Sequence, residues 1–293
     1  MPVCDIKEHS ILERFEDINS IRKALKPFWD SKKIIGLVPT MGALHEGHIS
    51  LLKQAKQECD VVVVTIFVNP TQFNNSGDLD NYPRTIDEDL ALLRGENCDI
   101  VFIPSVEEVY PKDYENIKVD LSPMDEVMEG VHRPGHFEGV ANVVSRFFKI
   151  IEPQKAYFGR KDFQQVTVVE ETARQLNLPV EIVPVETLRA SNGLALSSRN
   201  KRLSGDELEK ASIIYRTLNY GKELAHQTSP KDALEKMKAY FENNSLELEY
   251  LDIVDPNSLE SLNQYWVPGT TACIAAFCGE VRLIDNMELV PND

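Results

Sequence analysis

Short apolar runs rich in β-branched residues alternate with stretches of helical periodicity through the first two-thirds of the chain. The apolar runs predict buried strands at residues 34–39, 61–68, 100–104, 156–158 and 180–185. The stretches between them predict helices over residues 49–59, 85–95, 139–151 and 162–176. Strands and helices that alternate in this way predict an α/β fold with a doubly wound parallel sheet.

The pattern changes after residue 184. A polar, glycine-containing segment leads into two predicted helices near residues 205–226 and 230–243, and three strand-like runs follow. These runs cover residues 246–254, 272–278 and 280–284. Helices followed by antiparallel strands predict a smaller C-terminal α+β domain. We therefore expect a Rossmann-like domain over residues 1–187 and the smaller domain over residues 188–293.

Three predicted helix starts carry a capping-box pattern, in which Ser or Thr is followed three residues later by Glu. The pairs are Thr85 with Glu88, Ser105 with Glu108, and Ser204 with Glu207.

The chain is acidic: 31 Lys and Arg residues against 47 Asp and Glu residues give a formal charge of −16 over 293 residues. This charge repels a phosphate backbone, so extended nucleic-acid or anionic-membrane binding is disfavoured. A small anionic ligand would need a local basic pocket. With 42% hydrophobic residues, the chain has enough apolar surface for a substantial core.

We expect a cytoplasmic protein, because the N-terminus lacks the apolar run of a signal peptide and no apolar stretch is long enough for a membrane helix. The five cysteines are scattered and form no C-x-x-C pair, which predicts reduced thiols rather than disulfides or a zinc site. They are Cys4, Cys59, Cys98, Cys273 and Cys278.

The segment from Val38 to His48 follows the strand at residues 34–39 and opens a helix. Helix N-termini attract anions, glycines at positions 42 and 47 allow close approach to the backbone, and His45 and His48 can donate hydrogen bonds to phosphate. The alternative is a plain turn with two solvated histidines. The segment lies at the carboxyl end of a strand, and this position favours the ligand-binding interpretation over the plain turn.

Three further segments offer suitable chemistry, each with a structural alternative. Asn69 and Gln72 can orient hydroxyl and carboxylate oxygens, or cap a strand. Residues 159–162 place basic side chains at a helix start, which suits a polyphosphate, although a surface Lys–Asp pair is common there. Residues 196–199 could bind phosphate through Ser and Arg, or form an ordinary linker.

His45-x-Gly47-His48 is typical of the HxGH nucleotidyl-transferase superfamily. Five further segments narrow the resemblance: VNPTQF at residues 68–73, NYPRT at 81–85, RPGHFEGV at 133–140, FGRKDFQQ at 158–165 and GLALSSRN at 193–200. Together they make the chain resemble the pantothenate synthetases (pantoate:β-alanine ligases). The resemblance covers the catalytic domain and the junction, whereas residues after about 205 match only in general character.

The resemblance implies roles for individual residues. The implied catalytic residues are His48, as the proton-transferring group, together with His45, Lys161 and Arg199. The implied ATP contacts are Met41, Gly42, His45, Gly47, His48, Gly159, Lys161, Asp162, Leu188, Leu196, Ser197, Ser198 and Arg199. The implied contacts with pantoate or β-alanine are Pro39, Met41, Asn69, Gln72, Arg133, His136 and Gln165.

Some positions depart from the family or carry weaker expectations. Arg160 replaces an acidic or amide residue, which would change the field around the triphosphate, whereas Leu196 in place of Met should matter little. Asp89 could assist Mg²⁺, which is expected to be held mainly by the ATP phosphates. The acidic run from Asp87 to Asp89 could instead simply favour the helix dipole.

The resemblance implies an AMP-forming ligase that joins pantoate to β-alanine through a pantoyl adenylate, with the second domain as a lid. It also implies a homodimer whose small-molecule partners are ATP, pantoate and β-alanine. The alternatives are another HxGH nucleotidyltransferase and a non-catalytic nucleotide-binding regulator. A tRNA-binding synthetase is disfavoured because the chain shows no evident basic surface.

Overall fold

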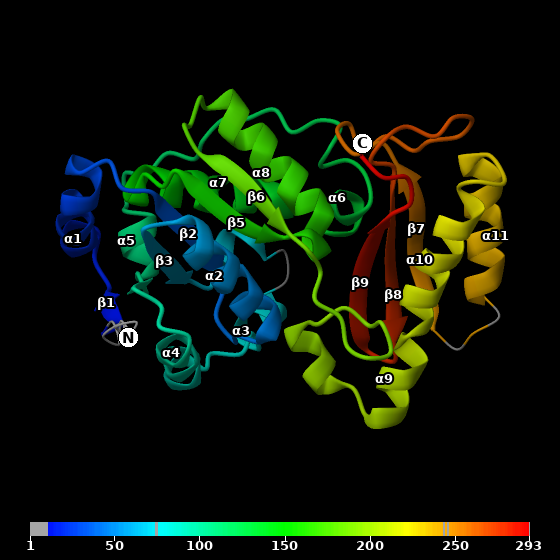
Figure 1. The fold of residues 1–293 in the computed structure, drawn as a ribbon, viewed down its shortest axis with the longest axis horizontal. Helices are drawn as coiled ribbons and strands as arrows, with labels where there is room; N and C mark the ends of the chain where they lie inside the picture. Colours follow the sequence, from blue (N-terminus) through cyan, green and yellow to red (C-terminus); the bar gives the residue numbers. More distant parts are fainter. Residues whose placement is uncertain (1–10, 74–75, 243, 245, 293) are drawn as a thin grey trace, which may run out of the picture.

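The computed structural model describes residues 11–73, 76–242, 244 and 246–292, so Cys4 and the N-terminal segment that bears on the signal-peptide prediction lie outside the described residues. Six parallel strands form the central sheet in the order β1-β4-β3-β2-β5-β6 (Figure 1). The strands are β1 (Glu13–Phe15), β2 (Ile35–Thr40), β3 (Val61–Ile66), β4 (Ile100–Phe102), β5 (Lys155–Gly159) and β6 (Glu181–Val185). The predicted doubly wound α/β fold is confirmed.

Helices cover both faces of this sheet, which is why its central strands are apolar on both sides. On one face lie α1 (Ile18–Asp30), α7 (His136–Ile151) and α8 (Phe163–Gln175), and they share a core with Val61 and Val63. On the other face lie α2 (Glu46–Glu58) and α4 (Ile86–Gly95), which pack with Val62 and Val64. The shorter elements are η1 (Pro70–Gln72), α3 (Ser76–Asp80), α5 (Val106–Val109), α6 (Glu129–His132) and η2 (Arg160–Asp162).

The strand order reverses direction at β2. The chain moves outward from β2 to β3 and β4 on one side, and then returns to place β5 and β6 on the other. The carboxyl ends of β2 and β5 therefore flank the topological switch point, where open α/β sheets bind their ligands. The two loops predicted to hold phosphates begin at these two strand ends.

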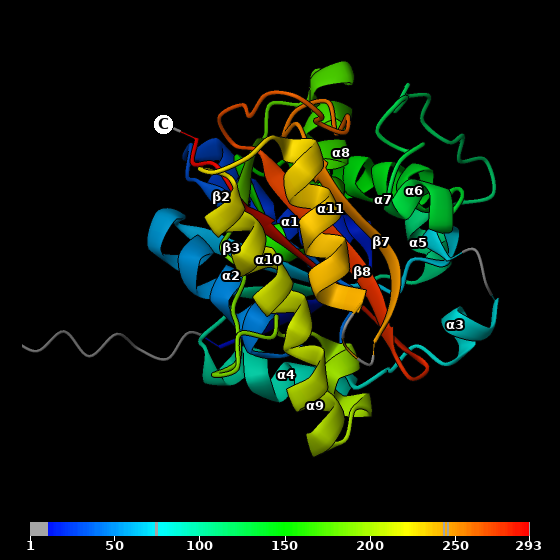
Figure 2. The same ribbon diagram turned by 90° about the vertical axis from the view of Figure 1, so that its right-hand side faces the viewer.

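The C-terminal part forms a three-stranded antiparallel sheet of β7 (Glu247–Val254), β8 (Thr271–Cys278) and β9 (Val281–Glu288), as predicted. Figure 2 shows α10 (Ile213–Leu224) and α11 (Pro230–Glu242) lying across this sheet. The core of this part is separate from the two cores of the central sheet. The boundary near residue 187 falls between β6 and η3 (Ser198–Arg202), and it stays a prediction.

Several details differ from the sequence predictions. The helix predicted over residues 205–226 is broken into α9 (Gly205–Ala211) and α10, because Ser212 turns the chain and donates its hydroxyl to the carbonyl of Glu209. Strand β1 and helix α1 were not predicted. Strand β1 has only three residues at the sheet edge, and α1 contains Pro27, which usually argues against a helix interior.

Of the three predicted capping boxes, the one at Ser204 and Glu207 is confirmed. The box at Thr85 is wrong, because its hydroxyl donates to Asp89 Oδ1 and makes no cap bond. Ser105 caps its helix, but the carboxylate of Glu108 accepts from the backbone N–H of Ile18 instead of completing the box.

The structure also bears on the thiols and on membrane crossing. Cys59, Cys98, Cys273 and Cys278 are free thiols, as the sequence predicted. Within the described ranges, no helix combines the length and apolar character needed to cross a bilayer.

Candidate active site

The loop after β2 is closed by its own two imidazoles. His45 Nδ1 accepts from the N–H of Gly47 at 3.1 Å, and His48 Nδ1 accepts from the N–H of His45 at 3.3 Å. Gly47 is needed here, because a Cβ at this position would lie 2.8 Å from the His45 ring. Since both Nδ1 atoms accept, each neutral ring carries its proton on Nε2. The two histidines therefore present two N–H donors to a ligand.

Both imidazoles are neutral at physiological pH. Burial lowers the pKa of His48 to about 3, and burial together with the nearby charges of Lys161 and Lys201 lowers the pKa of His45 to about 4. The rings lie 4.1 Å apart, so two cations there would repel each other. This arrangement differs from two solvated histidines on a turn: it is a pair of oriented, neutral hydrogen-bond donors.

Asp89 holds the same loop from behind. Its side chain is buried, and its two oxygens accept from the N–H groups of Ala43 at 2.9 Å and Leu44 at 2.7 Å. Both oxygens are thus engaged by the protein, and no group of three or more His, Cys, Asp or Glu residues able to hold a metal occurs in the described part of the chain. The structure gives Asp89 the task of anchoring the loop. The predicted contact with Mg²⁺ has no support here.

A pair of amide side chains lies next to the loop. Asn69 and Gln72 are buried; Asn69 donates to the carbonyl of Gly139 and to Gln72 Oε1, and Gln72 Nε2 donates to Met41 Sδ at 2.9 Å. Helix α7 approaches η1 so closely that a Cβ at Gly139 would lie 2.4 Å from the carbonyl oxygen of Thr71. These contacts fix the orientation of both amides and join two predicted site segments.

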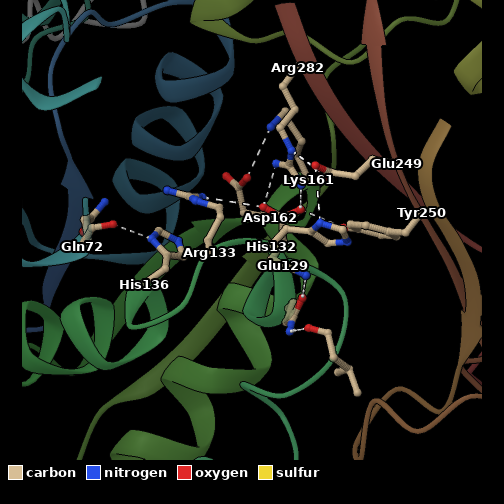
Figure 3. Close-up of polar contacts among 12 residues, drawn as sticks. Gln72, Glu129, His132, Arg133, His136, Lys161, Asp162, Glu249, Tyr250 and Arg282 are labelled. Carbon is tan, nitrogen blue, oxygen red and sulfur yellow. Dashed lines mark hydrogen bonds and ion pairs between the residues drawn. The ribbon is translucent and has the colours of Figure 1, made fainter. Parts of the chain in front are cut away.

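His136, at the start of α7, belongs to the same group of residues. Its Nδ1 lies 2.9 Å from the backbone carbonyl oxygen of Gln72, and its side chain is buried (Figure 3). Burial and the neighbouring charge of Arg133 lower the pKa of His136 to about 4, so this ring is also neutral. The structure therefore brings η1 and the start of α7 together, and the assignment of both to one substrate site stays a prediction.

The loop after β5 supplies a cation next to the histidines. Lys161 Nζ lies 3.3 Å from Asp162 Oδ1, and although burial disfavours the charge of Asp162, Lys161 lowers its pKa. Arg160 turns away and pairs with Glu186 at 2.7 Å and Glu288 at 3.0 Å. Its positive charge is therefore balanced by two carboxylates, which limits the predicted change in the field around a triphosphate.

The backbone of this loop is also held by the C-terminal sheet. Asn286 in β9 donates from Nδ2 to the carbonyls of Arg160 and Lys161, both at 2.8 Å. Asn286 was not predicted as a site residue, because nothing around it in the sequence marks a site. A residue near the end of the chain thus sets the position of the phosphate-binding candidate.

The serine and arginine segment adds further positive charge. Ser197 Oγ accepts from the N–H of Arg199 at 3.2 Å and begins η3. Arg199 opposes the rise in the pKa of Tyr82, which burial raises to about 12, and Lys201 acts on His45. These electrostatic interactions indicate that the segment lies close to the loop after β2. Tyr82 and Lys201 were not predicted as site residues.

Three further predicted site residues, Leu188, Gln165 and Pro39, are less tightly held by the structure. Leu188 is 42% exposed and accepts from the N–H of Leu196 through its carbonyl. Gln165 is half-buried, and its side chain has no hydrogen-bond partner in the ranges that the structure describes. The neighbouring Gln164 is buried and bonds to the backbone of α6 and the preceding loop, so it serves the fold. Pro39 is half-buried in β2.

A buried glutamate joins the two parts of the molecule beside Lys161 and Asp162 (Figure 3). Glu129 in α6 accepts two hydrogen bonds from Arg282 in β9, at 2.6 and 3.0 Å, and one from Tyr250 in β7 at 2.9 Å. Arg133 lies 3.7 Å from the same carboxylate. Burial disfavours the charge of Glu129, but Arg282 keeps its pKa well below the ordinary value. This network was not predicted from the sequence.

Comparison with known proteins gives a consistent result. A family profile described as "Pantoate-beta-alanine ligase" matches residues 13–288. The pantothenate synthetase of Porphyromonas gingivalis (strain ATCC 33277) is 47% identical over 282 residues, covering 94% of this chain and 99% of the relative. That of Acinetobacter baumannii (strain ATCC 17978) is 42% identical over 273 residues, covering 93% and 96%.

Solved structures agree. The pantothenate synthetase of Thermus thermophilus superposes with a TM-score of 0.89 at 41% identity, covering 96% of this chain and all of that one. The pantoate-β-alanine ligase of Francisella tularensis, complexed with β-γ ATP and β-alanine, gives a TM-score of 0.75 at 35% identity and covers 95% and 98%. With the HxGH loop, the oriented amides and the basic loop all placed around one switch point, the chain belongs to the pantoate-β-alanine ligase family.

Proposed function

We propose that this enzyme condenses pantoate with β-alanine by activating pantoate as an adenylate. A carboxylate is a poor electrophile, so its oxygen first attacks the α-phosphorus of ATP and releases pyrophosphate. The amine of β-alanine then attacks the acyl carbon of pantoyl adenylate and expels AMP, giving pantothenate. The observation that carries this proposal is the pair of phosphate-binding candidates, after β2 and after β5, on both sides of the switch point.

The first step needs donors aimed at the transferring phosphoryl group rather than an enzyme nucleophile. His45 and His48 supply oriented Nε2–H groups, Lys161 supplies a nearby cation, and Arg199 with the serines of η3 approaches from the C-terminal part. We assign ATP contacts to the residues around them. These are Met41, Gly42, Gly47, Gly159, Asp162, Leu188, Leu196, Ser197 and Ser198.

We place pantoate against the amide pair. Asn69 and Gln72 are held in fixed orientation, so they can recognise hydroxyl and carboxylate oxygens without neutralising the attacking carboxylate. Pro39, Met41 and Gln165 complete this side in the proposal. His136 lies between Gln72 and Arg133 (Figure 3), and we assign His136 and Arg133 to the binding of the second substrate.

Magnesium enters this proposal as part of the MgATP substrate. The residues in the site do not offer a ready metal cage, since Asp89 is bonded to the loop and Asp162 lies beside Lys161. The C-terminal part would act as a lid that excludes water from the adenylate. A homodimer and a cytoplasmic location stay predictions.

Mass spectrometry of a reaction with ATP, Mg²⁺, pantoate and β-alanine tests the function. The expected products are pantothenate, AMP and pyrophosphate, with each substrate required. A stable nucleotidyl conjugate with no amide would favour a different nucleotidyltransferase. ATP binding without turnover in this mixture would favour a nucleotide-binding regulator. Either result would overturn the proposal.

A further inference from the structure

The imidazoles of the candidate site use Nδ1 in two different ways, as a hydrogen-bond acceptor or as a donor. In His45 and His48, Nδ1 accepts from a backbone N–H, which leaves the proton on Nε2. In His136, Nδ1 faces the carbonyl oxygen of Gln72 at 2.9 Å, and a carbonyl can only accept. His136 must therefore carry its proton on Nδ1, and Nε2 keeps an unshared pair. Nε2 has no hydrogen-bond partner in the part of the chain that the structure describes.

This difference separates two chemical tasks. A phosphate needs donors, which His45 and His48 provide. The amine of β-alanine enters as an ammonium ion, because an aliphatic amine has a pKa of about 10. An ammonium ion needs an acceptor before its nitrogen can become a nucleophile. Among the three histidines, only His136 presents an acceptor at Nε2.

Resting on the proposed function, we propose that His136 is the catalytic residue that receives the ammonium group of β-alanine, accepting an N–H hydrogen bond and then a proton at Nε2. The hydrogen bond from Nδ1–H to the Gln72 carbonyl is kept throughout and fixes the ring. Figure 3 shows His136 between Gln72 and Arg133, so the amine would meet the ring beside the predicted pantoate site.

Arg133 gives the other end of β-alanine a partner. Its guanidinium is 3.7 Å from Glu129, and the Glu129 carboxylate already accepts two hydrogen bonds from Arg282 and one from Tyr250. A substrate carboxylate can therefore pair with Arg133 without breaking that network. An amino acid with its acid and amine groups separated would reach both Arg133 and His136.

The charged groups around His136 support a basicity that depends on the substrate. In the free site burial disfavours the imidazolium, Arg133 opposes it further, and the more distant carboxylates of Glu129 and Asp162 favour it. A substrate carboxylate on Arg133 would cancel the opposing charge. His136 would then become a better base when β-alanine is bound.

The proposed step balances in atoms and charge. The ammonium nitrogen transfers one proton to Nε2, its freed electron pair forms the C–N bond at the acyl carbon, and the C–O bond to the phosphate breaks with its electron pair on AMP. The nitrogen loses a second proton to solvent as the amide forms. The imidazolium returns its proton to solvent, which restores neutral His136.

The test measures the two half-reactions separately in full-length wild type and His136→Asn, and it uses two different amines for the transfer half-reaction. Asparagine keeps an N–H donor at the Nδ1 position for Gln72, but it has no atom at the Nε2 position. Adenylation is measured as pantoate-dependent exchange of labelled pyrophosphate into ATP. Transfer is measured in single turnovers with β-alanine or with hydroxylamine, which is already unprotonated at neutral pH.

For His136→Asn, we expect transfer to β-alanine to fall about a hundredfold more than adenylation does. Transfer to hydroxylamine should fall no further than adenylation. Equal slowing with both amines, or loss of exchange in parallel with transfer, would show that His136 only supports Gln72 and would overturn the proposal. Absence of exchange in the wild type would instead overturn the proposed function.

A second variant keeps the test decisive if His136→Asn does not fold. His136→Gln places a carbonyl oxygen near the Nε2 position, where it can accept a hydrogen bond but cannot hold a proton at neutral pH. It should also transfer more slowly to β-alanine than to hydroxylamine, relative to the wild type. Equal transfer to both amines in this variant would overturn the proposal.

Discussion

The loop after β2 and the segment from Ser197 to Arg202 offer the same kind of chemistry but are held very differently. The first loop is fixed by buried Asp89 and by two imidazole nitrogens, each of which accepts a hydrogen bond from a backbone N–H of the loop. The second is held by short local bonds, and none of its cationic side chains forms an ion pair within the described residues. One surface is thus organised before ATP arrives, whereas the other keeps its charge available for the ligand.

This contrast has an energetic meaning. Donors that are fixed by folding need little reorganisation when charge develops on a phosphoryl group. Unpaired cations on a short 3-10 turn give up rotational freedom when they bind, but they can follow the triphosphate as it changes. Substitutions in the first loop should therefore affect both rate and stability, and substitutions in the second should affect rate alone.

The largest effect is expected for His48→Ala. The variant loses one aimed donor and should adenylate pantoate at least about a hundredfold more slowly, equivalent to roughly 2.7 kcal/mol. Pyrophosphate exchange measures the rate, and circular dichroism checks that the fold is retained. Near-normal exchange in a folded variant would remove His48 from the proposed site.

Arg199→Ala should come next, with adenylation about thirtyfold slower because a cation on the triphosphate is lost. Its free energy of unfolding in urea should stay within about 0.5 kcal/mol of the wild type, since the side chain makes no ion pair with any residue that the structure describes. Arg202→Ala, in the same turn and exposed, is the matched control and should retain its exchange rate. Equal losses in both variants would point to a general charge effect.

Asp89→Asn tests the anchored loop. The change replaces one carboxylate oxygen with an amide NH2 group, which cannot accept from a backbone N–H, so the free energy of unfolding should fall by about 1.5 kcal/mol. Adenylation should slow about tenfold, with an unchanged dependence on Mg²⁺ concentration. If stability is retained but more Mg²⁺ is required, then Asp89 acts on the metal and not on the loop.

The smallest effect concerns pH. His48 and His136 have folded pKa values of about 3 and 4, below the ordinary 6.5, so the unfolded chain binds more protons between these limits. Their contribution to stability is complete above pH 6.5 and is lost as pH falls towards about 4 for His136 and about 3 for His48. Protonation of these rings should change the adenylation rate less than about twofold between pH 7 and 8.

Urea unfolding at several pH values measures this dependence, and His136→Asn supplies the comparison. The variant should lose stability less steeply than the wild type between pH 6.5 and 4. Identical slopes in the two proteins would mean that the imidazole of His136 is not held neutral by the fold.

The sequence predicted the parts of the structure that are determined locally. The apolar runs of β2 and β3 are buried on both faces, so their pattern is unambiguous, and the position of His45 and His48 at a strand end already indicated a ligand. Strand β1 escaped prediction because an edge strand of three residues leaves almost no pattern. The burial of Gln164 and the partial exposure of Gln165 follow from helical rotation, and only the family resemblance singled out Gln165 in advance.

Other parts of the site depend on residues that meet only in the folded chain. Arg282 contacts Glu129 across 153 positions of sequence, and Asp89 reaches back 45 and 46 positions to the loop amides. The sequence did not mark Glu129, and it marked Asp89 for magnesium rather than for the loop. Their roles follow from packing, which no local motif records.

The bonds from Asn286 to the loop after β5 have a consequence for the newly synthesised polypeptide. A ribosome produces the HxGH loop long before Arg282 and Asn286. These two residues reach Glu129 and the loop after β5 only after β9 has paired. The site is therefore complete only after residues that follow the histidines by more than 230 positions in the chain have been made. A nascent or prematurely terminated product would carry the histidines without the strand that positions Lys161, so its phosphate-binding loop after β5 would lack this support.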